Sequence, residues 1–168
     1  GKVKAGSVNS TTVCTTDFFA TFAELLGKQD EIPDNAAEDS FSFLPCLKGA
    51  KKPIRPFTIH HSISGVFAIR KGDWKLILNK GAGGGWGGSW DTTKTTAKLV
   101  QLYNMKEDPG ETKNLELEHP DVVKELVDDL AKVFRDGRTT PGEKQSNEGW
   151  PYRDGATQTK FPQLKNPG

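Results

Sequence analysis

The sequence predicts an α+β fold, in which a small antiparallel β-sheet packs against one long C-terminal helix and a further helix precedes the sheet. Two observations indicate this arrangement. Apolar residues recur with helical spacing over 16–26 and over 120–135, and the stretch between them alternates with the period of a strand. Because only 34% of the 168 residues are hydrophobic, the core is expected to be small and confined to a few segments.

The first predicted helix carries one apolar stripe. Four apolar residues recur at i, i+4, i+7 and i+8, which places them on one face: Phe18, Phe22, Leu25 and Leu26. A side-chain oxygen within 15–17, which holds two threonines and an aspartate, can cap the start of the helix, and Gly27 can end it.

A short helical turn and a linker follow this helix. Ser40 is expected to cap a brief turn over 41–44, and Pro45 limits the length of that turn. The basic, proline-bearing stretch 49–56 is the best internal boundary of the chain.

The predicted sheet comes next. Residues 66–78 indicate a tight hairpin with 71–72 at its turn, and 99–105 reads as a further strand. In that register Ile69 opposes Trp74, so Trp74 is expected to be a core residue of the hairpin rather than a platform for a sugar ring.

The last predicted helix has the strongest pattern. Pro120 suits the first helical position, with His119 before it as the cap, and Gly137 ends the helix. Because an isolated helix of about 17 residues is marginal in water, this one must pack on the sheet. Its apolar face consists of Val122, Val123, Leu126, Leu130, Val133 and Phe134.

Composition excludes several classes of function. The net charge is +1, from 23 basic and 22 acidic residues, which does not favour a nucleic-acid or anionic membrane surface. No stretch approaches the roughly 20 apolar residues of a membrane span, and no signal peptide opens the chain, whose true N-terminus we expect to lie upstream. Cys14 and Cys46 allow one disulfide, but two separate thiols are favoured.

Six segments of the chain follow one another in an order and spacing that is typical of one enzyme family. They are GKVKAGSVN, TTDFFATFAELLG, DSFSFLPCLKG, AIRKGDWKLI, QLYNMKEDPGETKNL and HPDVVKELVDDL. Together they span roughly residues 1–145 and resemble the C-terminal end of type I sulfatases, the arylsulfatase-like enzymes of the alkaline-phosphatase superfamily.

The resemblance implies three parts and a role. Residues 1–50 would be the tail end of the large sulfatase domain, with the first helix packed on its α/β core, and 51–137 would be the C-terminal sulfatase subdomain. Residues 138–168 would form an extended or disordered tail. The subdomain would complete the substrate cleft and stabilise the catalytic domain of a periplasmic or secreted sulfuric ester hydrolase.

The resemblance also implies what this chain lacks. In the family, a formylglycine made from Cys or Ser attacks sulfur, and a divalent cation, expected to be calcium, neutralises the sulfate oxygens. Neither Cys14 nor Cys46 lies in a matching motif, and the metal-binding acidic residues have no counterpart. We therefore expect no catalytic residue, metal site or cofactor in this chain, and no activity alone. Its expected partner is the N-terminal catalytic domain, and the full enzyme would take a sulfated saccharide or an aryl sulfate.

The candidate substrate-binding residues are His60 and His61, at the end of a predicted strand. Because this subdomain contributes to substrate selectivity in the family, one imidazole would line the cleft and contact the leaving group. The alternative is a structural histidine at a strand end. A nucleophilic pair of a histidine with Ser62 or Ser64 is disfavoured, because no nucleophile elbow surrounds these serines.

Two further segments have a possible binding role. Trp86 and Trp90, in the Gly- and Thr-rich stretch 80–97, could contact a saccharide or a partner chain, although a flexible loop is the simpler interpretation. The basic run 48–55 could attract an anionic glycan, but a solvated linker is favoured.

A second hypothesis is a stand-alone interaction or glycan-binding module that kept the fold without the chemistry. The stripe of the first helix separates the two hypotheses. A portion of a larger enzyme should expose Phe18, Phe22 and Leu25 as a patch or hide them by self-association, whereas a stand-alone module should bury them in its own core.

Overall fold

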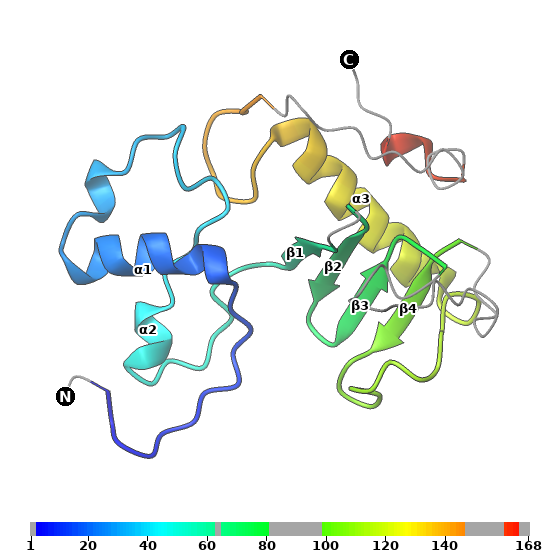
Figure 1. The fold of residues 1–168 in the computed structure, drawn as a ribbon, viewed down its shortest axis with the longest axis horizontal. Helices are drawn as coiled ribbons and strands as arrows, with labels where there is room; N and C mark the ends of the chain where they lie inside the picture. Colours follow the sequence, from blue (N-terminus) through cyan, green and yellow to red (C-terminus); the bar gives the residue numbers. More distant parts are fainter. Residues whose placement is uncertain (1–2, 63–64, 81–98, 147–159, 165–168) are drawn as a thin grey trace. The chain divides into compact units, whose positions relative to one another are not determined.

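The computed structural model describes residues 3–62, 65–80, 99–146 and 160–164 (Figure 1). The chain divides into two compact units, which are described separately below. The N-terminal unit consists of residues 1–58 and 136–147, and the sheet unit consists of 59–135 and 148–168. The strands and helices confirm the predicted α+β class. The domain boundaries drawn from the sequence stay predictions.

The described residues of the N-terminal unit form several short helices. Its elements are η1 (Thr15–Asp17), α1 (Phe18–Leu25), η2 (Gln29–Glu31) and α2 (Leu44–Leu47). The apolar stripe therefore located α1 correctly. Gly27 follows the helix with a φ of 71°, the left-handed conformation that glycine adopts at a helix C-terminus.

The start of α1 is capped by a residue from outside the helix. Asp17 is the N-cap residue, but its side chain makes no capping hydrogen bond. The backbone N–H of Ala20 instead donates to Ser40 Oγ at 2.9 Å, and that hydroxyl donates to the backbone oxygen of Thr16 at 2.7 Å. The prediction that 15–17 caps the helix and that Ser40 caps the following turn is therefore wrong, because Ser40 lies beside α1.

Removing this cap should weaken the N-terminal unit. Ser40→Ala is expected to lower its free energy of unfolding by about 1 kcal/mol, the usual cost of losing an N-cap. Hydrogen exchange of the α1 amide groups measures the effect. The matched control is Ser7→Ala, since the Ser7 hydroxyl is exposed and donates to the backbone oxygen of Lys4 within its own turn. Equal effects of the two variants would contradict the capping role.

The sheet unit is built on a four-stranded sheet with the strands in sequence order. The pairs β2–β3 and β3–β4 are antiparallel, which confirms the predicted antiparallel sheet. The strands are β1 (Thr58–His61), β2 (Phe67–Lys71), β3 (Trp74–Ile77) and β4 (Gln101–Asn104).

The hairpin between β2 and β3 turns one residue later than predicted. Lys71 pairs with Trp74 and Ile69 pairs with Leu76, so Gly72 and the residue after it form the turn. Gly72 has a φ of 58°, which a primed two-residue hairpin turn requires at its first central position. The predicted pairing of Ile69 with Trp74 is therefore wrong.

The helix α3 (Pro120–Asp136) covers one face of the sheet (Figure 1). The ring of Phe67 in β2 meets Phe134 of α3 edge-on, with 5.3 Å between centroids. On the same face Lys71 Nζ donates to Glu125 and to Asp129, each at 2.7 Å. The buried core of this unit includes Ile69, Leu76, Leu78, Val100, Leu102, Val123, Leu126, Val127, Leu130 and Ala131.

The ends of α3 agree in part with the sequence. Pro120 begins the helix as predicted, and Gly137 follows its last residue with a φ of 65°. The ring of His119 lies against that of Trp74, with 4.9 Å between centroids. Trp74 is half-buried in this contact, so it does not belong to the buried core as predicted.

Two described segments lie within the predicted tail. In the N-terminal unit, Arg138 is buried, and its Nη1 lies 3.0 Å both from the backbone oxygen and from the carboxylate of Asp34. In the sheet unit, η4 (Pro162–Leu164) follows Phe161, and both Phe161 and Leu164 are buried. The rest of that tail lies outside the described residues.

Candidate functional site

The two histidines proposed for substrate binding lie on opposite faces of the sheet. The ring of His61 lies 5.5 Å from that of Phe67, which contacts α3, so His61 points to the helix side. Its Nδ1 lies 2.9 Å from the backbone oxygen of Ser62. Because neighbouring residues of a strand alternate, His60 points to the other face. The two imidazoles therefore do not converge on one ligand.

His60 is exposed on β1. Although the residue is exposed overall, partial burial of its ring lowers the pKa of His60 below the usual value for histidine, and the nearby Lys75 charge lowers it further. Glu111 acts in the opposite direction, and His61 adds a smaller lowering effect. These influences together favour the uncharged form of the His60 imidazole, which has one nitrogen as donor and one as acceptor.

Lys75 and Glu111 form an ion pair on this face of the sheet. Lys75 Nζ donates to Glu111 Oε1 at 2.5 Å, and both side chains are largely shielded from solvent. Glu111 has a φ of 55°, which is uncommon for a residue with a side chain. The loop is held by Asp108, whose carboxylate accepts the backbone N–H groups of Thr112 and Lys113 at 2.7 and 2.8 Å.

A second polar group on this face comes from β4. Tyr103 Oη donates to Gln101 Oε1 at 2.6 Å, and Gln101 Nε2 donates to the backbone oxygen of Asn79 at 2.8 Å. Burial raises the pKa of Tyr103, and the negative charge of Glu111 raises it further. Tyr103 lies opposite Lys75 in the β3–β4 register. The sequence patterns did not single out Tyr103, Gln101 or Glu111, because the contacts of these side chains depend on the register of the strands.

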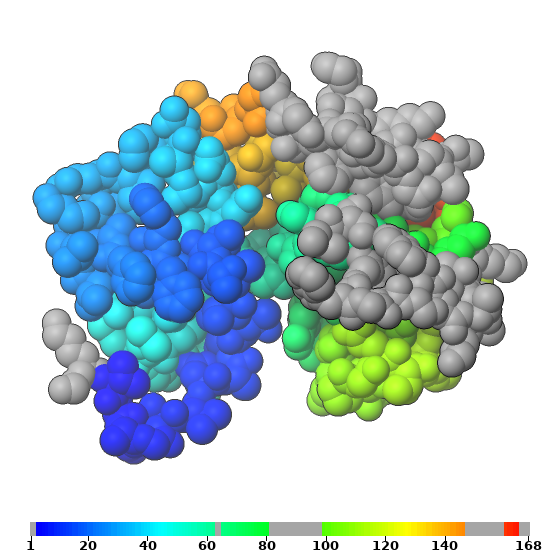
Figure 2. All heavy atoms as spheres, viewed as in Figure 1, coloured from blue at the N-terminus to red at the C-terminus, as the bar shows by residue number. Residues whose placement is uncertain are grey.

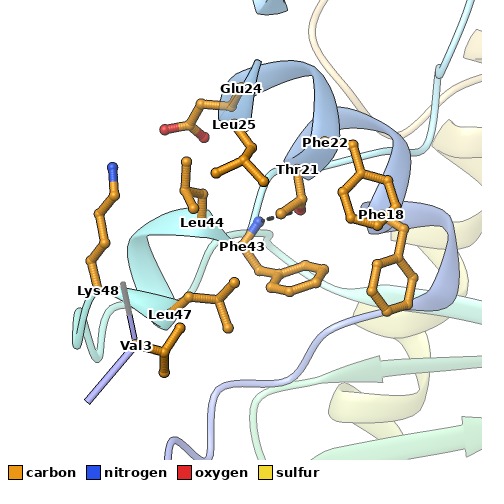
Figure 3. A pocket seen from close by; sticks show the side chains of 10 residues that line it. All are labelled: Val3, Phe18, Thr21, Phe22, Glu24, Leu25, Phe43, Leu44, Leu47 and Lys48. Carbon is orange, nitrogen blue, oxygen red and sulfur yellow. Dashed lines mark hydrogen bonds between the residues drawn. The ribbon is translucent and has the colours of Figure 1, made fainter. Parts of the chain in front are cut away.

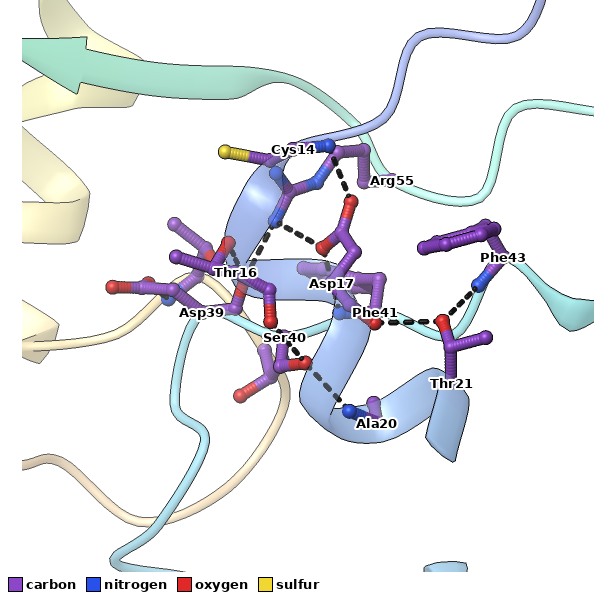
Figure 4. A network of polar contacts seen from close by, with 12 residues as sticks. Cys14, Thr16, Asp17, Ala20, Thr21, Asp39, Ser40, Phe41, Phe43 and Arg55 are labelled. Carbon is purple, nitrogen blue, oxygen red and sulfur yellow. Dashed lines mark hydrogen bonds and ion pairs between the residues drawn. The ribbon is translucent and has the colours of Figure 1, made fainter. Parts of the chain in front are cut away.

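The N-terminal unit has a buried ion pair at its centre (Figure 4). Asp17 is fully buried, with Oδ1 at 3.3 Å from Arg55 Nη2. Its carboxylate also accepts the backbone N–H groups of Cys14 and Phe41, at 2.7 and 2.9 Å. Arg55 donates to the backbone oxygen of Asp39 at 2.7 Å. The interpretation of the basic run as a solvated linker is therefore wrong for Arg55.

Both cysteines are free thiols, as the sequence favoured, and Cys46 is buried. Burial raises the pKa of Cys14, but hydrogen bonds with Thr16 and the positive charge of Arg55 outweigh this effect and lower it overall. Across the residues that the structure describes, no group of three His, Cys, Asp or Glu side chains could hold a metal ion. None of the described helices is long and apolar enough to cross a membrane.

An apolar groove lies on α1 and α2, with a volume of about 370 Å³ (Figure 3). Phe18, Phe22 and Leu25 in its wall are 49%, 55% and 49% exposed. This confirms the predicted patch. The two segments that carry the groove, blue and cyan, lie side by side at the surface in Figure 2. The groove is lined by Val3, Phe18, Thr21, Phe22, Glu24, Leu25, Phe43, Leu44, Leu47 and Lys48.

Among the remaining candidates Ser62 lies within the described residues. The Ser62 hydroxyl accepts the backbone N–H of Val66 at 3.2 Å within a turn, and His61 contacts the Ser62 carbonyl oxygen rather than its hydroxyl. Ser64, Trp86 and Trp90 lie outside the described residues.

Comparison with known proteins identifies relatives of this chain. No protein-family model matches it. The chain is 33% identical over 118 residues to an N-acetylgalactosamine-6-O-sulfatase of Bacteroides thetaiotaomicron, and the match covers 70% of this chain and 22% of that enzyme. The chain thus spans about a fifth of the length of this curated relative.

Solved structures show the same correspondence. One, from work on the metabolism of multiple glycosaminoglycans by Bacteroides thetaiotaomicron, is 33% identical over 70% of this chain and 24% of its own, with a TM-score of 0.56. Another, bound to its substrate D-glucosamine-2-N,6-O-disulfate, is 26% identical over 78% of this chain and 26% of its own, with a TM-score of 0.55. The crystal structure of Ps i-CgsB shares the fold over 95% of this chain and 31% of its own, at 20% identity and a TM-score of 0.58. The chain is therefore homologous to sulfatases and corresponds to their C-terminal portion.

Proposed function

We propose that this chain is the C-terminal portion of a sulfuric ester hydrolase that acts on a sulfated saccharide. Within that enzyme it stabilises the catalytic part and completes the substrate cleft, and it is inactive alone. The observation that carries the proposal is the 33% identity to an N-acetylgalactosamine-6-O-sulfatase over 118 residues. The complex of a second relative with a disulfated glucosamine supports a sulfated saccharide as the substrate class.

The groove on α1 and α2 supports the structural role. Within the N-terminal unit Asp17 and Arg55 bond to each other and to its backbone, although Arg55 Nε and Thr139 Oγ1 are buried without a hydrogen-bond partner. Phe18, Phe22 and Leu25 remain exposed in the folded unit. Full burial of such a side chain is worth about 1.5–3 kcal/mol relative to full exposure. Because these three are already about half-buried, covering the rest gains about half of that each and favours a partner surface.

The occupant that we propose is the catalytic part of the same protein. The aligned region makes up only 22% of the curated relative, so most of a protein of that kind would be available to cover the groove. That part would contain the formylglycine and a divalent cation, expected to be calcium, which supply the nucleophile and neutralise the sulfate oxygens. We also propose that the whole enzyme is periplasmic or secreted.

His60 is the residue that we propose for the substrate cleft. Both histidines are exposed, but His60 lies on the sheet face away from α3, whereas His61 contacts Phe67 on the helix side. We therefore retain His60 as the substrate contact and assign His61 a packing role. The geometry of the two side chains supports this division.

Activity and docking together test the proposal. The 168-residue chain alone should not hydrolyse 4-nitrophenyl sulfate. Co-expression with the N-terminal part of the same protein should give a co-purifying, active complex, and Phe22→Asp should reduce its yield at least tenfold, because a charge then enters the groove. Val8→Asp is the matched control, since Val8 is 90% exposed and does not line the groove.

Two results would contradict the proposal. Hydrolysis of the aryl sulfate by this chain alone would show that catalysis does not need another part. Equal yields of the complex for Phe22→Asp and Val8→Asp would show that the groove is not the docking surface.

A further inference from the structure

The sheet face away from α3 carries a half-buried arginine, Arg70 of β2. It alternates with Ile69, which is fully buried, and with Lys71, which bonds to α3, so its side chain lies on the opposite face. Arg70 Nε donates to the backbone oxygen of Gly72 at 3.4 Å, a long contact at the end of the strand. In the part of the chain that the structure describes, no carboxylate pairs with this guanidinium group, so its two Nη groups are available as donors.

The strand register places Arg70 in a row with two other side chains. Lys75 of β3 lies directly opposite Arg70, and Tyr103 of β4 lies directly opposite Lys75. Directly opposed residues have Cβ atoms about 4.5–5.5 Å apart, so the two cations are neighbours across the strands. Like charges in this arrangement destabilise a sheet. The row therefore keeps two positive charges together at a cost in stability.

Glu111 compensates Lys75. Lys75 Nζ donates to Glu111 Oε1 at 2.5 Å, and the two side chains are only 18% and 29% exposed. Glu111 has a φ of 55°, so an uncommon backbone conformation accompanies the placement of this carboxylate. Two positive charges and one negative charge leave a single positive charge on the described part of this row. That charge belongs to Arg70.

The donors of the row match an anionic group with two or more oxygens. A guanidinium group presents parallel N–H donors that fit two oxygens of one carboxylate or sulfate group. An ammonium group has three donors, and Glu111 accepts from one of those of Lys75. Tyr103 adds no donor, because its hydroxyl donates to Gln101 Oε1 at 2.6 Å. Arg70 would therefore supply the main contact and Lys75 an additional one.

We propose that Arg70, with Lys75 beside it, binds an anionic group of the saccharide, either a sulfate ester or a carboxylate. This inference rests on the proposed function and specifies the ligand chemistry of one sheet face. His60, the proposed substrate contact, lies on that face in β1, the strand next to β2. The groove assigned to the catalytic part is apolar, whereas this face is polar and positively charged, which favours an anionic saccharide here.

Kinetics of the whole enzyme test the role of Arg70, with the disaccharide of chondroitin 6-sulfate as substrate, because it carries both a sulfate ester and a carboxylate. Arg70→Gln should raise KM about tenfold with little change in kcat, the low end for a hydrogen bond between charged groups, since Arg70 is only half-buried. KM of this variant should also rise less steeply with salt concentration than KM of the wild type. Arg70→Lys should recover part of the loss, because it keeps the charge without the fork.

The matched control is Arg135→Gln, which removes the same charge from an exposed position on α3 and should leave KM unchanged. Two further substrates identify the anionic group. N-acetylgalactosamine 6-sulfate carries the sulfate ester alone, and the disaccharide with its uronate reduced to glucose carries no carboxylate. An effect of Arg70→Gln that persists with both assigns the sulfate ester to Arg70, and an effect lost with both assigns the carboxylate. An unchanged KM for all three substrates would overturn the inference.

Two other roles of Arg70 give different results. If it paired with a carboxylate of the catalytic part, Arg70→Gln would reduce the yield of the co-purified complex and leave KM of the assembled enzyme unchanged. If it were merely structural, Arg70→Gln would lower the urea midpoint of this chain without a change in KM. We expect an unchanged or higher midpoint, because the variant removes the repulsion of Lys75. Either of the other two results would overturn the inference.

Failure of this inference differs from failure of the proposed function. A whole enzyme without sulfatase activity would refute the proposed function, and with it the assignment of a saccharide to this face. An active enzyme whose KM is the same for Arg70→Gln and Arg135→Gln would refute only the binding role of Arg70.

Discussion

Arg55→Leu should destabilise the N-terminal unit by about 3–5 kcal/mol, the cost of leaving a buried charge without its partner. The Arg55 side chain is only 4% exposed and that of Asp17 is 0% exposed, so water cannot replace the lost contact. Removing Arg55 also leaves the backbone oxygen of Asp39 without this donor. Hydrogen exchange of the α1 amide groups measures the loss, because it reports the local stability of this unit.

The double variant Asp17→Leu with Arg55→Leu separates charge from hydrogen bonding. It removes the unpaired charge, yet the backbone N–H groups of Cys14 and Phe41 lose their acceptor. We therefore expect only partial recovery. The control is Lys52→Leu in the same linker, at an exposed position, which should change stability by no more than about 0.5 kcal/mol. An effect of Arg55→Leu as small as that of Lys52→Leu would contradict a structural ion pair.

The elements that the sequence predicts well are those with a local signal. The stripes of α1 and α3 each repeat over several turns, so their positions agree with the structure to within about two residues. The hairpin register was missed by one residue, because alternation fits a turn on either side of Gly72. The cap of α1 was missed because Ser40 reaches the helix from 20 residues away in the chain.

The candidate site shows the same limit. His60 and His61 stand out in the sequence as a pair, but their alternation in β1 separates them in space. Lys75 and Glu111 lie in two different segments, WKL and DPGET, and no local pattern joins them. The sequence indicated a relation between these two segments only because both belong to the six segments that follow one another in the order typical of sulfatases. Arg55 was likewise assigned to a solvated run, because the sequence does not reveal the Asp17 carboxylate that it meets.

Leu76→Ala should destabilise the sheet unit by about 2–5 kcal/mol, the range for a large-to-small change in a core. Leu76 is fully buried and lies opposite Ile69 on one side and Leu102 on the other, both also fully buried. This row faces α3, because Phe67 and Lys71 on the same face of β2 contact that helix. Urea unfolding followed by tryptophan fluorescence measures the change.

The matched control for this prediction is Leu117→Ala, which removes the same atoms from a side chain that is 68% exposed in the same unit. It should cost no more than about 0.5 kcal/mol. If Leu76→Ala lowered the free energy of unfolding by no more than the control does, α3 would not shield this face of the sheet from water. In that case the cavity left by the missing atoms would be open to water, and the contact of α3 with the sheet would rest on Lys71 and Phe134 instead.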